Sequence, residues 1–453
     1  MPANPINRRT FVQAAATAAI ALPGARAATK PRRVALIGSG WYGKNDLFRL
    51  VQVEDVEIVA LCDPDKHQLE RDAGVCATRH KSGKRPNLYG DYRELLKQEE
   101  PDMVEVATPD HWHCLPAIAA MKSGADVYVQ KPISVDVIEG QSMVAAARKY
   151  KRVVQVGIQR RSAPHLIEAR DRVQSGMLGK ISHAEVCCYV YKGPRGNPPD
   201  IEPPAHLDYD MWTGPAPMRP FTQGWTHPRR WRYFMEYGNG VIGDMCIHML
   251  DMVRWTLDLG WPHTIYSTGG ILQDKESKSN TPDTQNATFS FDNMDVLWTH
   301  RNWGRPVDPE YPWAFFIHGE KGVLKASTRQ WEFVPWDPEE KTIRQAAYTE
   351  MWKYDIDRID HVESPLPQAE FPVLRAHMQN YLSAIDSRDK PVGDIEQGHI
   401  SSSSCILANI SREVGRALRW DPVKHRVIGD DEANAKLARP YRKPWVHPTP
   451  HTV

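Results

Sequence analysis

The sequence predicts an α/β protein whose first half folds as a doubly wound parallel sheet. Two observations predict that sheet: a glycine-rich turn directly follows a short apolar strand, and strands then alternate with helices up to residue 157. A third observation concerns the second half, where apolar residues alternate with period two in several short runs and so predict another sheet.

The first element is a strand over residues 33–37 that ends at Gly38-Ser39-Gly40-Trp41-Tyr42-Gly43. Apolar residues then recur at helical spacing from Leu47 to Val51, so the order is strand, G-x-G-x-x-G, helix. The first glycine permits a tight turn, the second lets a pyrophosphate approach the backbone, and the third allows close packing of helix on strand. The pattern predicts a dinucleotide-binding Rossmann unit.

The second strand, residues 56–62, ends at Asp63. A carboxylate at this position accepts the ribose hydroxyls of the adenosine and repels a 2′-phosphate, so it favours NAD over NADP. The structural alternative is a turn aspartate before Pro64.

Strands and helices continue to alternate along this unit. Helices are expected over 92–96, 115–121 and 137–150, and strands over 103–107, 127–129 and 153–156. The carboxyl ends of such strands line the ligand crevice. Two ends carry chemically interesting residues, Thr108-Pro109-Asp110-His111-Trp112-His113 and Gln130-Lys131-Pro132.

His111 and His113 could suggest a metal pair, but their spacing after a strand is unusual and no set of further ligands accompanies them. No metal is therefore expected. Both histidines are predicted to line the cofactor crevice together with Thr108 and Pro109.

The second half predicts a sheet followed by two helices. Strands are expected over 181–186, 287–291 and 296–299, a hairpin over 315–325, and helices over 373–385 and 400–418. The predicted domains are a signal peptide over 1–27, a Rossmann domain over 28–157, a substrate and oligomerisation domain over 158–420, and a C-terminal arm over 421–453.

Composition excludes several classes of protein. The chain has 453 residues, 57 basic and 56 acidic, so its formal charge of +1 gives no bulk attraction to nucleic acid or to an anionic membrane. No apolar run is long enough for a membrane span. The seven cysteines are odd in number and form no C-x-x-C pattern, so they are expected to be small buried hydrophobes.

Residues 1–27 are expected to be a targeting signal. Arg8-Arg9 precede an alanine-rich run over 14–22, and Ala25-Arg26-Ala27 is suited to signal peptidase. The paired arginines resemble a twin-arginine signal, which implies export to the periplasm in the folded state. The alternative is an alanine-rich N-terminal helix.

Taken together, G-x-G-x-x-G, Asp63, Ala107-Thr108-Pro109 with His113, and Lys131-Pro132 resemble the Gfo/Idh/MocA oxidoreductase family. The resemblance continues through 157–161, 212–215, 240–251 and 439–445. It implies a second, α+β domain on a large, open, mainly antiparallel sheet that covers the nicotinamide and mediates homo-oligomer contacts, as a dimer or tetramer. One departure is Gln130, since the family usually has glutamate before the Lys-Pro pair.

The resemblance also assigns roles to residues. Lys131, His248 and Asp244 are the catalytic candidates: the ammonium stabilises charge on the reacting oxygen, and an imidazole with an unperturbed pKa near 6.5 takes a hydroxyl proton. Asp244, His248 and Asp251 have the spacing of one helical face, with Met245 and Met249 on the other side. An ion pair on a surface helix is the alternative. Gln159 is expected at the cofactor, and the further substrate candidates are Arg160, Arg161, His165, Trp231, Arg232 and Tyr233, for which packing is the alternative.

The sequence thus predicts an exported, NAD-dependent oxidoreductase that acts on a CH–OH group of a carbohydrate or polyol and keeps its cofactor bound. Two alternatives remain open. One is a redox-neutral glycosidase or lyase that oxidises a sugar transiently, and the other is a non-catalytic carbohydrate-binding protein on a Rossmann scaffold.

Overall fold

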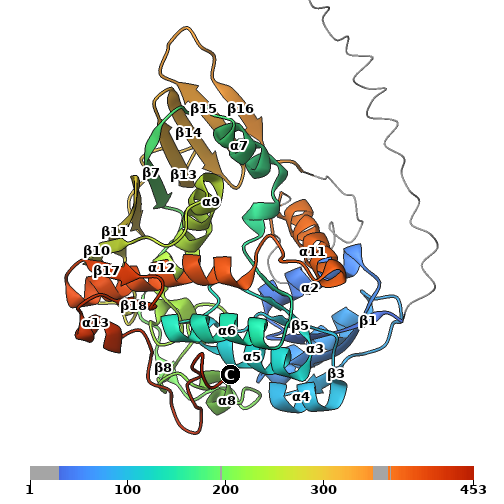
Figure 1. The fold of residues 1–453 in the computed structure, drawn as a ribbon. Helices are drawn as coiled ribbons and strands as arrows, with labels where there is room; N and C mark the ends of the chain where they lie inside the picture. Colours follow the sequence, from blue (N-terminus) through green and yellow to red (C-terminus); the bar gives the residue numbers. More distant parts are fainter. Residues whose placement is uncertain (1–29, 194–195, 350–365, 368) are drawn as a thin grey trace, which may run out of the picture. The chain divides into compact units, whose positions relative to one another are not determined.

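A six-stranded parallel sheet forms the N-terminal part of the computed structural model, in the order β3-β2-β1-β4-β5-β6 (Figure 1). The structure describes residues 30–193, 196–349, 366–367 and 369–453, so the predicted signal over 1–27 lies outside the described residues. The strand order reverses between β1 and β4, which places a ligand crevice at their carboxyl ends. The strands are β1 Arg32–Ile37, β2 Val56–Cys62, β3 Asn87–Tyr89, β4 Met103–Val106, β5 Asp126–Val129 and β6 Val154–Val156.

Helices connect these strands, as the alternation predicts. Three of them begin at aspartates whose side chains accept backbone N–H groups of the first turn, namely Asp65, Asp91 and Asp136. The first helix differs, because it follows Gly40 without a side-chain cap and has no acidic residue in its first turn. Its N-terminal N–H groups therefore face the crevice. The helices are α2 Trp41–Val53, α3 Lys66–Ala77, α4 Tyr92–Glu99, α5 Cys114–Ser123 and α6 Val137–Lys149.

The second sheet has ten strands in the order β16-β15-β14-β13-β7-β12-β11-β10-β17-β18. Neighbours are antiparallel except β7 and β12, which run parallel. This confirms the expected large, mainly antiparallel sheet. The strands are β7 Ile181–Cys188, β10 Thr264–Gly270, β11 Thr284–Phe291, β12 Met294–Arg301, β13 Trp313–Gly319, β14 Gly322–Ser327, β15 Gln330–Pro335, β16 Ile343–Ala346, β17 Leu418–Asp421 and β18 Arg426–Val427.

Helices pack on one face of this sheet and supply its core. These are α7 (Pro164–Gln174), α9 (Ile247–Leu257) and α12 (Ile395–Val414). The helix expected over 400–418 is shorter at its end, because Gly415 adopts a left-handed conformation with φ +71° and closes α12. Leu418 then starts β17 instead of ending the helix.

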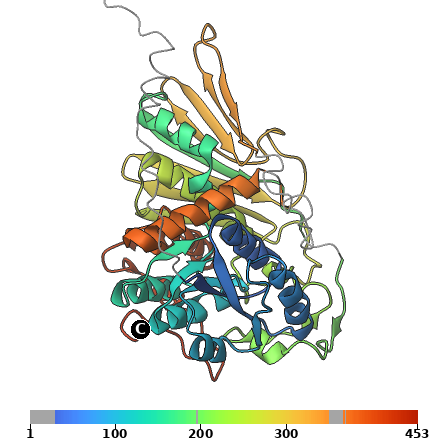
Figure 2. The same ribbon diagram turned by 90° about the vertical axis from the view of Figure 1, so that its right-hand side faces the viewer.

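Two late helices bring the sheets together within residues 32–453. Helix α11 (Glu370–Ser387) packs on α2, and α12 contacts both α6 and β10. Figure 2 shows an orange helix between the blue and teal parallel sheet and the yellow and orange strands. The C-terminal segment therefore contributes to both halves of the molecule.

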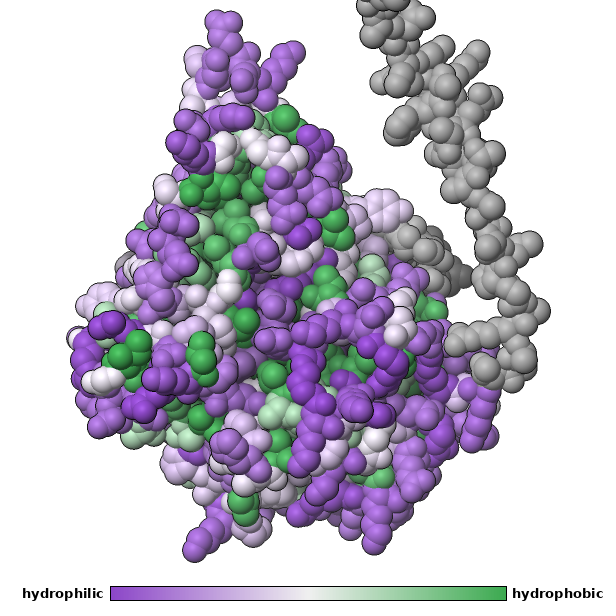
Figure 3. Space-filling view, in the orientation of Figure 1, coloured by the Kyte–Doolittle hydropathy of each residue, from purple (hydrophilic) through white to green (hydrophobic). Residues whose placement is uncertain are grey.

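The surface in Figure 3 is mostly polar, with a group of apolar side chains over the strands β13 and β14. All seven cysteines are free and buried, which confirms that they serve as small hydrophobic residues. Within the described part of the chain, every helix is too short or too polar to cross a membrane.

Candidate active site

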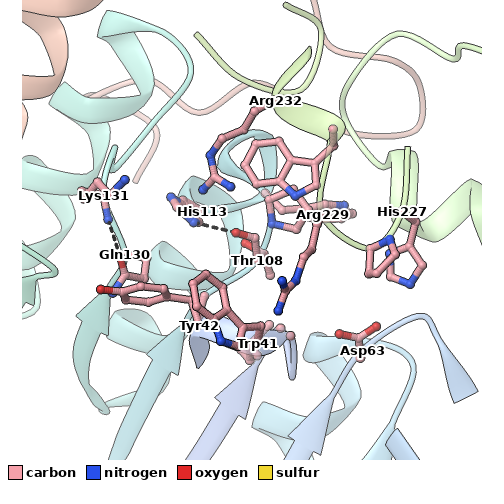
Figure 4. Close-up of a pocket in the computed structure, with 18 of the residues that line it drawn as sticks. Trp41, Tyr42, Asp63, Thr108, His113, Gln130, Lys131, His227, Arg229 and Arg232 are labelled. Atoms are coloured by element: carbon pink, nitrogen blue, oxygen red, sulfur yellow. Dashed lines mark hydrogen bonds between the residues drawn. The ribbon is translucent and has the colours of Figure 1, made fainter. Parts of the chain in front are cut away.

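A cavity of about 470 Å³ lies at the carboxyl ends of β1, β2, β4 and β5. Its opposite wall comes from the short helix η3 (Trp231–Tyr233), the π-helical turn η4 (Ile242–Cys246) and α9. Figure 4 shows side chains from both walls pointing toward one another. The predicted site residues that line it are Gly38, Gly40, Trp41, Tyr42, Asp63, Thr108, Pro109, His113, Lys131, Arg160, Trp231, Arg232, Asp244 and His248.

The glycine-rich turn fits a dinucleotide. Gly38 has φ +91°, and a Cβ there would lie 2.6 Å from the backbone nitrogen of Thr108. A Cβ on Gly43 would lie 2.5 Å from the carbonyl oxygen of Gly38, so the third glycine is needed for helix packing. Nothing lies within 4 Å of the Cβ position of Gly40. That open space, in front of the uncapped α2, is suited to a pyrophosphate.

Asp63 organises this turn and also lines the cavity. One carboxylate oxygen accepts from the Ser39 N–H at 3.1 Å and from Gln68 Nε2 at 2.8 Å, and the other accepts from the Asp65 N–H at 3.0 Å. Burial raises the pKa of Asp63, and the nearby His227 opposes that shift. A carboxylate oxygen has two lone pairs, so acceptor capacity remains for ribose hydroxyls.

Lys131 is held by Asp244 from the opposite wall. Its Nζ donates to Asp244 Oδ1 at 2.6 Å and to the Asp244 carbonyl at 3.0 Å. Burial would raise the pKa of Asp244, but Arg232 and Lys131 outweigh it and lower that pKa. The carboxylate partner of the lysine therefore comes from η4 and not from the residue before the lysine.

Gln130, the departure noted in the sequence, is a cavity residue in its own right. Its Nε2 donates to Asp46 Oδ2 at 2.6 Å, and its Oε1 accepts from the Lys131 N–H at 3.3 Å. Burial raises the pKa of Asp46 to about 8. A Cβ on Gly157 would lie 2.6 Å from Gln130 Nε2, so that glycine makes room for the amide.

His248 presents a neutral imidazole at the same end of the cavity. Burial lowers its pKa well below the ordinary value, and the cations Lys131 and Arg160 lower it further. Its ring meets Trp313 edge-on, with centroids 5.5 Å apart. A neutral imidazole next to a lysine ammonium can accept a proton from a hydroxyl that both groups contact.

The spacing predicted that Asp251 shares a helical face with Asp244 and His248, but Asp251 does not line the cavity. Asp251 instead accepts two hydrogen bonds of 2.8 Å from Arg161 and one from Ser401 Oγ, in a buried ion pair. Met245, expected on the apolar side, lines the cavity. The reason is the π-helical turn η4, which changes the helical register between Asp244 and α9.

Seven predicted site residues do not line the cavity, and each makes a contact within the protein. Four of them are held by hydrogen bonds: the Ser39 N–H binds Asp63, Arg161 binds Asp251, His111 binds the Trp212 carbonyl, and His165 binds the Ser327 carbonyl. Gln159 donates to the Tyr42 hydroxyl at 2.7 Å, Gly43 packs on Gly38, and Tyr233 packs on Trp225.

Sequence reasoning missed a segment that closes the adenosine end, which we call the strap, residues 198–230. It contributes Met211, Trp212, His227, Pro228 and Arg229 to the cavity wall. The strap has little regular structure, and its main signal in the sequence is its high proline content.

Two anchors hold the strap. Asp65 accepts from His206 Nδ1 and His227 Nε2, both at 2.9 Å. At its other side, Arg442 of the C-terminal arm donates to the Gly214 carbonyl at 3.0 Å and to Asp210 Oδ1 at 2.6 Å. The arm is itself fixed through His447, which donates to Asp136 at 2.8 Å.

Three family models match the chain. An oxidoreductase family with an NAD-binding Rossmann fold matches residues 32–158, a GFO/IDH/MocA C-terminal domain matches 217–325, and an oxidoreductase C-terminal alpha/beta domain matches 167–265 and 345–447. The chain therefore belongs to the Gfo/Idh/MocA oxidoreductase family, and it has that family's NAD-binding fold.

The chain spans between a third and a half of the length of the curated relatives that it matches. A glycosyl hydrolase family 109 protein of Shewanella sp. is 29% identical over 164 residues, which are 35% of each chain. An inositol 2-dehydrogenase/D-chiro-inositol 3-dehydrogenase of Lactiplantibacillus plantarum is 28% identical over 153 residues, 33% of this chain and 41% of the relative.

Solved structures show the same fold. An oxidoreductase from Agrobacterium radiobacter, in complex with NAD+, L-tartaric acid and magnesium, has a TM-score of 0.64 at 16% identity, over 86% of this chain and 98% of the other. An aldose-aldose oxidoreductase from Caulobacter crescentus, complexed with glycerol, has a TM-score of 0.62 at 16% identity and is covered completely, over 86% of this chain.

Proposed function

We propose that the protein is an NAD-dependent oxidoreductase that acts on a CH–OH group of a carbohydrate or polyol. The observation that carries this proposal is the cavity itself. One end has the glycine-rich turn with Asp63, and the other end has Lys131 beside the neutral imidazole of His248.

The residues at this end of the cavity fit the cofactor. Gly38, Gly40 and the N-terminus of α2 would hold the pyrophosphate, and Asp63 would accept hydrogen bonds from the ribose hydroxyls. NAD, when bound, supplies the acceptor for a hydride from the substrate carbon. NADP is disfavoured, because Asp63 would repel a 2′-phosphate.

The remaining chemistry belongs to two side chains. Lys131 donates a hydrogen bond to the reacting oxygen and stabilises negative charge that develops there. His248 receives the hydroxyl proton, and its low pKa keeps it unprotonated and ready at neutral pH. Asp244 fixes the ammonium through the 2.6 Å bond.

The position of the strap supports the proposal that the cofactor stays bound through the catalytic cycle. It covers the adenosine end and is fixed on both sides, by Asp65 and by the C-terminal arm. A retained cofactor suits the export that the Arg8-Arg9 signal predicts, because the folded enzyme would carry its NAD to the periplasm.

We extend the proposal to the oligomeric state, and propose that the protein is a homo-oligomer, a dimer or tetramer.

If NAD stays bound through the cycle, each hydride taken from a sugar would have to return to a sugar. The acceptor is a second sugar carbonyl or the oxidised substrate itself. The second route gives the alternative function, a glycosidase or lyase. A transient ketone would acidify the neighbouring C–H, His248 would remove that proton, and the glycosidic group would take up a proton and leave as its alcohol, so that an unsaturated ketone forms. In a lyase this ketone would then be reduced directly, whereas in a glycosidase water would first add across the C=C bond. The relatives named as glycosyl hydrolase family 109 proteins favour this alternative.

The non-catalytic alternative from the sequence is less well supported. A scaffold that only binds sugar does not need a cavity that combines a dinucleotide turn with a lysine, a buried carboxylate and a neutral imidazole.

The test uses the purified full chain without added NAD. We expect dinucleotide to remain through dialysis, and added sugar or glycoside to change its near-ultraviolet absorbance. Release of an aglycone without net redox change would identify the glycosidase route. A protein that purifies empty and consumes external NAD stoichiometrically would show that the cofactor is a dissociable substrate.

A further inference from the structure

Arg232 is a guanidinium in the substrate end of the cavity with unused hydrogen-bond donors. Its Cζ lies over the ring of Trp231, 3.9 Å from the ring centroid, and its side chain is 27% exposed. Figure 4 shows it extending from the strap side of the cavity toward His113. Among the described residues, it donates no hydrogen bond, although its Nε is buried.

The carboxylates near Arg232 form ion pairs with it but accept no hydrogen bond from it among the described residues. Asp244 Oδ1 lies 3.3 Å from its Nε, and the same oxygen accepts the hydrogen bond of Lys131 Nζ at 2.6 Å. Asp110 Oδ1 lies 3.6 Å from its Nη2, which is beyond hydrogen-bond distance. Burial raises the pKa of Asp110 to about 7, and Arg232 opposes that shift. The half-buried guanidinium therefore has N–H donors without acceptors among the described residues.

Three cations at this end of the cavity face three carboxylates, but they are not bonded alike. Lys131 donates a hydrogen bond to Asp244, and Arg160 donates one of 2.5 Å to Glu370. Arg232 forms ion pairs of 3.3 Å with Asp244 and 3.6 Å with Asp110, and among the described residues neither carboxylate accepts a hydrogen bond from it.

The position of Arg232 relates it to the reacting group. Lys131 Nζ and Arg232 Nε contact the same oxygen of Asp244, so they lie within the width of one sugar ring. A substrate whose hydroxyl binds Lys131 would place its next substituent against the guanidinium.

We propose that the substrate is an acidic carbohydrate, a sugar ring with a carboxylate that binds Arg232 in a two-pronged contact. This inference rests on the proposed function and names its substrate class. The planar fork matches a carboxylate better than a single hydroxyl does, and Trp231 holds it in place. Arg232 is then the residue that determines specificity.

The experiment compares matched pairs of probes that differ only at one carbon. Methyl β-D-glucuronide is compared with methyl β-D-glucoside, and methyl α-D-galacturonide with methyl α-D-galactoside. Binding to the dinucleotide-loaded full chain is measured by calorimetry and by tryptophan fluorescence, since Trp231 and Trp313 line the cavity. We expect at least one uronide to bind about 10-fold tighter or more than its neutral partner. That advantage should fall as salt rises from about 0.05 to 0.5 M.

The variants are Arg232→Gln, Arg232→Lys and, as a matched control, Arg230→Gln. Arg230 is exposed and does not line the cavity, so its variant removes the same charge two residues away. The uronide preference should persist in R230Q, decrease in R232K and disappear in R232Q, while all three variants retain dinucleotide.

Equal binding of uronides and neutral glycosides by the wild type would overturn the inference, as would a preference that persists in R232Q. If neutral glycosides alone change the absorbance of the bound dinucleotide, the proposed function stands and the acidic substrate is wrong. If no probe of either kind binds or changes that absorbance, the proposed function fails as well.

Discussion

Asp65 is where the strap is joined to the dinucleotide-binding turn, so its replacement by Asn tests whether the strap retains the cofactor. The side chain has two tasks. It caps α3 by accepting from the His67 N–H at 2.9 Å and the Gln68 N–H at 3.1 Å, and it binds His206 and His227 of the strap. Asn caps a helix as well as Asp does, so Asp65→Asn removes the charge and spares the helix.

The size of the effect follows from the two imidazole contacts. A hydrogen bond to a charged group contributes about 1.5–3 kcal/mol when buried. His206 is 30% exposed and its bond is partly screened, whereas His227 is 12% exposed. Oδ1 of Asp65 caps α3 and also accepts from His206, so the amide oxygen of Asn keeps that acceptor, and D65N removes the Oδ2 bond to His227. Loss of this bond costs about 1.5–3 kcal/mol, which corresponds to a roughly 10- to 150-fold weaker hold on the dinucleotide.

The assay counts dinucleotide per protein after timed dialysis, by chromatography of the nucleotide released on denaturation. The control is Asp430→Asn, which alters the aspartate cap of α13 (Asp431–Ala435), away from the cavity lining. D65N should lose its dinucleotide much faster than the wild type and D430N. Equal retention of dinucleotide in all three proteins would refute the prediction that the strap holds the cofactor.

Three further predictions concern the cavity and the arm. Lys131→Met and His248→Ala should each lower kcat of the loaded enzyme by roughly 10²–10⁴ while dinucleotide is retained, and near-full turnover in either would exclude that residue from the proton path. Asp63→Ala should weaken NAD far more than NADP in calorimetric titrations, because it removes the ribose acceptor and the repelling charge; equal losses would contradict the assignment. Burial disfavours the charged form of His447, but its hydrogen bond to Asp136 outweighs this and raises its pKa. The contribution of His447 to arm docking is therefore complete below the unfolded pKa of about 6.5, and it is lost as the pH rises through the raised folded value. Hydrogen exchange of residues 439–453, corrected for intrinsic rates, should accordingly increase between about pH 6 and 9 in the wild type. The His447→Gln variant should not show this increase.

The Rossmann half was predictable because its signals are local. A strand that ends in a glycine-rich turn needs backbone conformations that neighbouring residues specify, and the structure has the predicted sheet with Gly38 at φ +91°. Lys131 was predictable for the same reason, since it lies at the end of a buried strand next to the crevice.

The register of Asp244, His248 and Asp251 was only partly predictable. Spacing placed all three on one face of an ideal helix, but the π-helical turn η4 rotates the chain between Asp244 and α9. Asp251 consequently meets Arg161 in the core while Asp244 meets Lys131 in the cavity. Nothing in the local sequence distinguishes an aspartate that pairs with a buried arginine from one that pairs with a cavity lysine.

The strap and its anchors could not be predicted at all. The local sequence indicates that Asp65 is an ordinary helix cap. Its bonds to His206 and His227 join positions more than a hundred residues apart. The sequence by itself determined the family, the parallel sheet, the dinucleotide turn and the lysine, because each depends on a short run of residues. Only the tertiary structure decided which carboxylate holds Lys131, which guanidinium keeps hydrogen-bond donors for a ligand, and what closes the cavity. Those outcomes depend on which side chains meet across the molecule, and a buried charge takes its partner from whatever the fold brings within hydrogen-bond distance.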